Sequence, residues 1–158
     1  MRPLTLLAVL ALAGCAGRVS PESFLQPQVD LRQVAVRNLG LAGGTLELTL
    51  AFANPNHLAL RGTALTAGLD LQGAHFGDIA LGDEFALAAG DTTLLQVPLT
   101  FRWSGVAGAA RGILDYGAVD YALEGNLAVN TPLGRAVSVP FSRQGNVPVL
   151  QPGLLPTH

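Results

Sequence analysis

The sequence predicts an all-β fold, namely an antiparallel β-sandwich of about seven strands with one short helix. Apolar and polar residues alternate with a period of two in segment after segment, so that each strand buries one face. Glycine and proline residues fall between these segments, where turns are expected. The 158 residues include a single cysteine, so one domain of ordinary size must be stabilised by its hydrophobic core without an internal disulfide.

The first predicted strand, within residues 29–39, contains a change of phase. Its apolar residues shift from Val29 and Leu31 to Val34 and Val36. Because a one-residue slip moves side chains to the opposite face of a sheet, we expect a β-bulge or a strand break near Arg32–Gln33.

The strands that follow are regular. Their apolar faces fall on alternate residues within 46–52, 65–71, 95–103, 119–129 and 137–141. Pro140 cannot donate a ladder hydrogen bond, so we expect it at a sheet edge or at a bulge. Only residues 104–116 depart from strand character, and there Ser104 can cap a short helix. Three prolines after Gly145 predict a flexible tail over residues 146–158.

The N-terminal residues have the layout of a secretory signal. Arg2 supplies a positive charge, an apolar run covers Leu4–Leu12, and small residues lead to Cys15. The run is too short to span a bilayer, which needs about 20 residues. The sequence Leu-Ala-Gly-Cys at residues 12–15 resembles the bacterial lipobox, which implies a signal peptide over residues 1–14 and lipidation of the Cys15 sulfur. An ordinary signal peptide with an incidental cysteine is the alternative.

Residues 15–27 are then a lipidated tether, because they lack a sustained period and contain two prolines. In extended form they reach on the order of 40 Å, at about 3.5 Å per residue. A diacylglyceryl group on Cys15 gives stable attachment without a transmembrane helix. Lipoproteins with no Asp after the cysteine are usually sorted to the outer membrane, and Ala16 follows it here. We therefore expect a lipid-anchored protein of the cell envelope, at the outer membrane and facing the periplasm.

One turn motif and three later segments carry a family resemblance. Asn54-Pro55-Asn56 follows an alternating strand; its first Asn can accept the backbone N–H two residues on, and Pro55 has a φ suited to the next turn position. The segments are DTTLLQVPLTF (91–101), YALEGNLAV (121–129) and TPLGRAVSVPFSRQG (131–145). Together they resemble the late embryogenesis abundant type 2 family, whose domain is also called WHy (water stress and hypersensitive response).

The resemblance covers the mature domain, assigned to residues 28–145, and bacterial members that carry a lipobox are similar throughout. It implies a sandwich like a fibronectin type III or immunoglobulin domain, and a role in tolerance of drying, cold or other stress. It implies no catalytic residue and no cofactor. We interpret Asn54, Pro55 and Asn56 as turn residues with a structural role.

Residue types used in catalysis and metal binding are scattered along the chain. His57, His75 and His158 lack metal-ligand spacing, and the single thiol is assigned to lipidation. Ser104 and Ser138 stand in no nucleophile motif. We therefore expect no metal site and no enzymatic activity.

For two further groups of residues we favour a structural role over ligand binding. Asp83 and Glu84 are expected in a solvated turn, with weak calcium binding as the alternative. Phe101 and Trp103 continue the apolar face of a strand, which favours core packing over ligand stacking.

The formal net charge of −2 and the lack of a basic cluster argue against nucleic-acid binding. Three functions remain open. The first is protective contact with partly unfolded proteins or the membrane through low-charge outer faces such as Ala51, Ala53, Ala122 and Ala128. The second is a module that docks a strand of one envelope partner at an open sheet edge. The third is carriage of a lipid or other apolar ligand in a cavity between the sheets.

Overall fold

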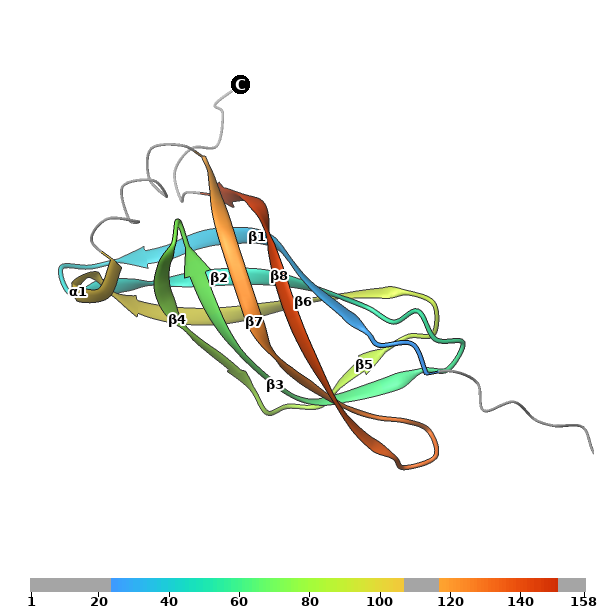
Figure 1. The fold of residues 1–158 in the computed structure, drawn as a ribbon. Coiled ribbons are helices and arrows are strands. Elements are labelled where there is room, and N and C mark those ends of the chain that lie inside the picture. The colour runs from blue at the N-terminus through green and yellow to red at the C-terminus, as the bar shows by residue number, and fades with distance from the viewer. Residues whose placement is uncertain (1–23, 107–116, 151–158) are drawn as a thin grey trace, which may run out of the picture.

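The computed structural model describes residues 24–106 and 117–150 (Figure 1). These residues form eight strands and one helical turn, so the all-β prediction is confirmed. The elements are β1 (Gln28–Leu39), β2 (Gly43–Ala53), β3 (Leu60–Leu71), β4 (Ala74–Leu81), β5 (Phe85–Leu87), β6 (Thr92–Arg102), α1 (Trp103–Val106), β7 (Ala118–Asn130) and β8 (Ala136–Leu150).

The strands belong to two antiparallel groups. One contains β1, β2 and β6, and the other contains β3, β4, β5, β7 and β8. A short parallel pairing joins the groups, because Val34 and Ala35 of β1 lie opposite Val149 and Leu150 of β8. The predicted layers are therefore linked into one sheet with the order β4-β3-β7-β8-β1-β2-β6, which wraps nearly closed around the core (Figure 1).

The open side of this sheet, between β4 and β6, is filled by aromatic side chains. The ring centroids of Phe76 and Phe101 lie 5.4 Å apart, and Phe101 meets Trp103 edge-on with 5.0 Å between centroids. Gly77 lies so close to β6 that an added Cβ would stand 3.1 Å from Leu99 Cδ1. Packing thus joins β4 to β6, where no ladder is formed between them in the described residues.

The alternating apolar faces form the core. Leu46, Leu48, Leu50 and Phe52 of β2 are each no more than 1% exposed. The equivalent residues of β3, β6, β7 and β8 are buried or half-buried against them, as the period of two predicts. Trp103 packs against the same core, which agrees with the packing interpretation of that residue.

The change of phase in the first strand is a bulge. The register of β1 against β2 shifts between Leu31 and Gln33, at the predicted place, and shifts again between Val36 and Asn38. The first shift lets β1 keep both its apolar sets buried.

The glycine of the YALEGNLAV segment (121–129), Gly125, has a packing role. Gly125 of β7 lies opposite Ala67 of β3. A Cβ at Gly125 would stand 2.1 Å from the carbonyl oxygen of Thr66, which no side chain tolerates. This position therefore requires glycine, because β3 and β7 approach each other closely there.

The last strand runs further than the sequence predicts, and the helix is described over fewer residues. β8 continues to Leu150 with Val147 and Val149 buried, so the tail predicted from residue 146 was wrong up to residue 150; alternation outweighed the prolines there. Among the described residues, Pro140 pairs with Asn126 of β7 and with no residue of β1, so it lies at a locally open edge, which is one of the two positions predicted for it. The predicted helix is described only as the turn α1, and residues 107–116 and 151–158 lie outside the described residues.

Candidate interaction surface

Asn54 organises one end of the sheet. Its side chain is 1% exposed and lies just after β2. Nδ2 is within hydrogen-bond distance of three carbonyl oxygens, at 2.9 Å from Leu58, 3.1 Å from Leu87 and 3.2 Å from Ala88. The Asn54 backbone N–H donates to the carbonyl of Asp91 over 2.9 Å. One buried amide therefore holds the β2–β3 loop against the β5–β6 loop.

The other two motif residues complete the turn. Asn54 Oδ1 accepts from the backbone N–H of Asn56 over 3.1 Å, the contact expected of an Asn that starts a turn. The Asn56 amide donates to the same oxygen over 2.9 Å, and Gly90 N–H donates to the Asn56 carbonyl over 2.9 Å. Pro55 lies exposed between them.

Asn56 also fixes the last residues of the predicted tether. Its Oδ1 accepts from Leu25 N–H over 2.8 Å, and its Nδ2 donates to the Leu25 carbonyl over 2.7 Å. The Asn56 side chain thus accepts one hydrogen bond from Leu25 and donates one to it, as the backbone of a neighbouring strand would. The sequence predicts the turn but gives no signal for this contact, because the partners are 31 residues apart.

The start of β1, the β2–β3 loop and the β7–β8 hairpin lie at one end of the molecule (Figure 1); we call it the tether end. The hairpin turns because Gly134 adopts a φ of 74° and donates its N–H to Thr131 over 2.9 Å. Pro132 and Leu133 thereby occupy the tip.

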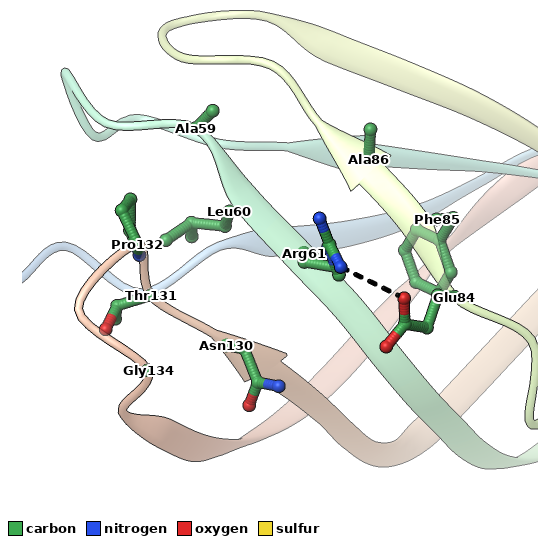
Figure 2. A pocket seen from close by; sticks show the side chains of 10 residues that line it. All are labelled: Ala59, Leu60, Arg61, Glu84, Phe85, Ala86, Asn130, Thr131, Pro132 and Gly134. Atoms are coloured by element: carbon green, nitrogen blue, oxygen red, sulfur yellow. Dashed lines mark hydrogen bonds and ion pairs between the residues drawn. The ribbon is translucent and has the colours of Figure 1, made fainter.

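Two shallow hollows flank this hairpin. The first, of about 610 Å³, is lined by parts of β3, β5 and the hairpin, and Arg61 Nη1 lies 3.3 Å from Glu84 Oε2 at its mouth (Figure 2). The second, of about 370 Å³, is lined by Phe24, Leu25, Leu58 and Leu133 among others, and shares Pro132 with the first. Both hollows are open at the surface of the tether end.

The low-charge outer faces predicted as a contact surface are largely covered. Ala51 is only 2% exposed, because β2 is flanked by β1 and β6. Ala53, Ala122 and Ala128 are half-buried. The most exposed large apolar side chains lie at the two ends of the molecule instead, Leu133 at the tether end and Leu41 at the β1–β2 hairpin, while Leu94, opposite Ala51 on β6, is 61% exposed.

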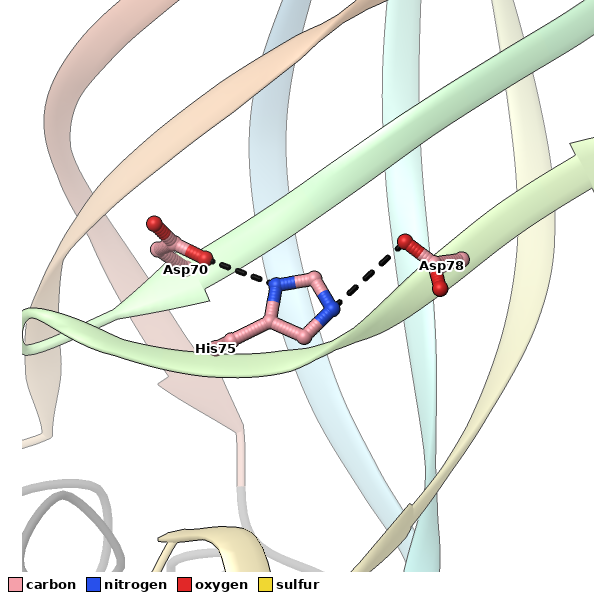
Figure 3. Close-up of polar contacts among 3 residues, drawn as sticks. All are labelled: Asp70, His75 and Asp78. Carbon is pink, nitrogen blue, oxygen red and sulfur yellow. Dashed lines mark hydrogen bonds and ion pairs between the residues drawn. The ribbon is translucent and has the colours of Figure 1, made fainter.

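A histidine and two carboxylates meet on the surface of β3 and β4 (Figure 3). His75 Nδ1 lies 2.9 Å from Asp70 Oδ1, and His75 Nε2 lies 3.5 Å from Asp78 Oδ1. All three side chains are about half exposed or more. Among the residues described, no group of three or more His, Cys, Asp or Glu is placed to hold a metal ion. This cluster is a surface network of polar contacts.

The other candidate residues are dispersed. Glu84 pairs with Arg61, and Asp83 lies exposed beside it. His57 lines the second hollow. Trp103 donates its Nε1–H to the carbonyl of Gly40 over 2.7 Å.

Ser104 is exposed and Ser138 lies on β8, so the structure does not bring them together with a histidine. Cys15 and His158 lie outside the described residues. In the described part of the chain, no helix has the length and apolar character needed to cross a membrane.

The sequence matches the family model described as late embryogenesis abundant protein over residues 49–145. No curated protein matches it significantly. The fold is similar to the solution structure of AT1g01470 from Arabidopsis thaliana, with 21% identity, 78% of each chain covered and a TM-score of 0.54. It is also similar to the solution structure of At2g46140.1, described as a late embryogenesis abundant (LEA) protein, with 18% identity, 78% of this chain and 71% of that chain covered, and a TM-score of 0.53.

Proposed function

The chain belongs to the late embryogenesis abundant protein family, type 2, and on that premise we propose that it is a lipid-anchored envelope protein that limits damage under drying or other stress. The observation that carries the proposal is the family match, which spans most of the β domain. The finer assignments to a WHy-type bacterial lipoprotein and to a fibronectin type III- or immunoglobulin-like sandwich are part of this proposal. The two antiparallel strand groups support the second of them.

The proposed anchor is the lipidated Cys15, at the outer membrane facing the periplasm. The Leu-Ala-Gly-Cys motif supports it, as does the way the chain enters the domain. Asn56 holds Leu25 by two hydrogen bonds, so the tether meets the domain at one defined end. A lipid on Cys15 would therefore turn the tether end toward the membrane.

The proposed work is done by surface contact, without an enzymatic step. The polar clusters of the described residues are accounted for by neighbouring side chains or carbonyl groups, as at Asn54, Glu84 and His75. Exposed apolar side chains at the two ends offer weak contact to partly unfolded proteins or to lipid.

Two measurements on cells test the anchor. Intact mass of the mature protein should show an acylated chain that begins at Cys15, and Cys15→Ala should leave the membrane fraction while its domain stays folded. Ser20→Ala, in the same tether, should stay in the membrane. Ala16→Asp should move the protein to the inner membrane. An unacylated mature chain, or membrane retention of Cys15→Ala, would contradict the anchor.

The protective role is tested separately. A deletion strain should survive drying, freezing or heat less well than its parent, and the wild-type gene should restore survival. In vitro, the protein should reduce aggregation of a client enzyme after drying more than an unrelated β-sandwich of the same size does. Equal protection by that control would remove the proposal.

A second candidate is docking of a partner strand along β8. Among the described residues, β8 pairs only with β7 from Ala136 to Asn146, so one side of its backbone is open to a strand. Against it, Pro140 and the ion pair between Arg143 Nε and Asp30 Oδ1, at 3.2 Å, obstruct that edge. Crosslinking at the membrane should then capture one stoichiometric partner, whereas diffuse capture favours the protective role.

The predicted carriage of an apolar ligand between the sheets gains no support here. It requires a cavity among the core side chains, and the two hollows described above open at the surface of the tether end, where Leu60 is the one buried core residue that lines them.

A further inference from the structure

The tether end carries a continuous group of exposed apolar side chains. Phe24 is 38% exposed, Leu58 47%, Leu25 51% and Leu133 92%, and all four line the same hollow. We call these four residues the apolar cap. They come from three separate segments, the end of the tether, the β2–β3 loop and the β7–β8 hairpin. Exposed apolar residues gathered from separate segments indicate a contact surface.

The length of chain between anchor and cap limits what the cap can meet. Eight residues lie between Cys15 and Phe24, and the nine steps from one to the other span on the order of 30 Å when fully extended and much less when relaxed. Because Asn56 binds Leu25, the last part of the tether adds nothing to this reach. A chain acylated at Cys15 thus keeps the apolar cap within the tether's length of lipid at all times.

The charge around the cap suits a membrane surface. The ionisable residues that line the hollow are Arg135 and His57. Arginine beside apolar side chains is the usual composition of a surface that lies in the lipid headgroup region, where anionic lipids attract it.

The opposite end of the sheet serves as a comparison. Leu41, at the tip of the β1–β2 hairpin, is fully exposed as Leu133 is. β1 runs between the two ends and has 12 residues, so these ends lie on the order of 40 Å apart. Leu41 is therefore an internal control, equally apolar and equally exposed but far from the anchor.

Given the acylation of Cys15 proposed above, we propose that the apolar cap docks on the lipid bilayer and that Leu133 enters its headgroup region. The lipid anchor and the cap then make two contacts with one membrane, and the long axis of the sheet stands away from the surface. The domain has a fixed orientation, with the β1–β2 hairpin pointing away from the membrane.

The test places an environment-sensitive nitrobenzoxadiazole dye at either end. Leu133→Cys or Leu41→Cys is introduced into the full lipidated chain, in which the Cys15 sulfur is blocked by its lipid and does not react with the dye. The protein is reconstituted in vesicles of phosphatidylethanolamine and phosphatidylglycerol. At position 133 we expect a several-fold rise in emission, a shift to shorter wavelength, and quenching by lipids that carry a quencher near the headgroup. At position 41 we expect none of these.

A second arm separates docking from natural acylation. The chain from residue 15, with Cys15→Ser and an N-terminal histidine tag, is attached to the same vesicles through a nickel-chelating lipid. The described strands begin at Gln28, so this change leaves them intact. Docking should give the same difference between positions 133 and 41. If acylation fails but this difference remains, the anchor proposal falls and the docking proposal stands.

Other results overturn docking. A water-like dye at position 133 in protein that floats with the vesicles would show an anchored domain that does not dock. A blue shift without vesicles that grows with protein concentration would show that a second copy covers the apolar cap. Arg135→Ser and Leu58→Asp should each weaken the signal at position 133; an unchanged signal in both would show that the dye itself, rather than the cap, enters the lipid.

Discussion

The two ends of the sheet are held together by different kinds of contact. At the tether end, the buried amide of Asn54 joins two loops through directed hydrogen bonds to carbonyl groups. At the opposite end, Trp103 packs edge-on against Phe101 and donates its Nε1–H to the Gly40 carbonyl and its backbone N–H to the Ala42 carbonyl, so aromatic packing is combined with hydrogen bonds there. Each end also exposes one leucine at a hairpin tip.

The difference is that, among the described residues, the segment leading into the sheet is held at one end only. The tether end includes a chain segment from outside the sheet, because Asn56 binds Leu25 as well as Asn54. Directed bonds hold that segment in one position, which apolar packing alone does not specify as closely. The opposite end has no such external segment among the described residues, and its aromatic contacts serve the closure of the sheet.

The largest effect is expected from Asn54→Asp. The change keeps the shape but places a carboxylate oxygen against carbonyl oxygens that now accept from Nδ2. We expect a loss of about 3 kcal/mol in the free energy of unfolding, measured by urea denaturation. Asn126→Asp, at an exposed position of β7, should change it by less than about 0.5 kcal/mol. A small loss at Asn54 would mean that the tether end does not depend on its polar centre.

A smaller effect is expected from Trp103→Phe at the opposite end. The variant keeps an aromatic ring beside Phe101 but loses the bond from Nε1 to the Gly40 carbonyl. We expect a loss of about 1 kcal/mol by the same measurement, because this bond is accessible to water. A loss equal to that of Asn54→Asp would erase the contrast between the two ends.

Asn56→Ala should affect one segment more than the whole fold. It removes both side-chain bonds to Leu25, which are exposed, and the side-chain bond to Asn54 Oδ1, which still accepts from the Asn56 backbone N–H; the global loss should therefore be about 1 kcal/mol. Hydrogen exchange at the Leu25 amide should become several-fold faster. Asn146→Ala removes a comparable exposed bond, to Asp120, and should leave exchange at Leu25 unchanged. Equal exchange in both variants would show that the tether is not held by Asn56.

The smallest effect is expected at the two hairpin tips. Leu133→Ser and Leu41→Ser should each stay within about 0.5 kcal/mol of wild type, because both side chains are exposed. Leu127→Ala, in the core, should cost about 3 kcal/mol in thermal denaturation. A destabilising effect at either tip would mean that its leucine supports the fold, so dye signals there would need another explanation.

The sequence predicts the parts of the fold that follow local rules. Alternation identifies β2, β3, β6 and β7, and the change of phase in β1 locates its bulge at Leu31–Gln33. β4 is not predicted from the sequence, because its buried residues, Phe76 and Ile79, are three positions apart and do not alternate. A register shift opposite Leu69 and Asp70 inserts an extra residue there, so a strict period of two is lost.

The candidate site depends on contacts between residues far apart in the sequence, which local sequence patterns do not predict. The turn at Asn54 is predictable, since its oxygen accepts from Asn56 two residues on. Its bonds to Leu87 and Ala88 join positions 33 and 34 residues away, and only the folded chain brings them together. The apolar cap is likewise made of segments whose adjacency depends on the order of the strands.

The bonds between Asn56 and Leu25 have a mechanical consequence. A pull on the N-terminal end of the chain would first load the bonds that hold Leu25 and would then reach β1 at Gln28 and run along it. Since β1 pairs with β2 along its whole length, that force loads the rungs of the ladder together, in shear. The two bonds to Leu25 lie ahead of the ladder and would break first. Under tension the chain would thus release a short length of slack before any strand separated.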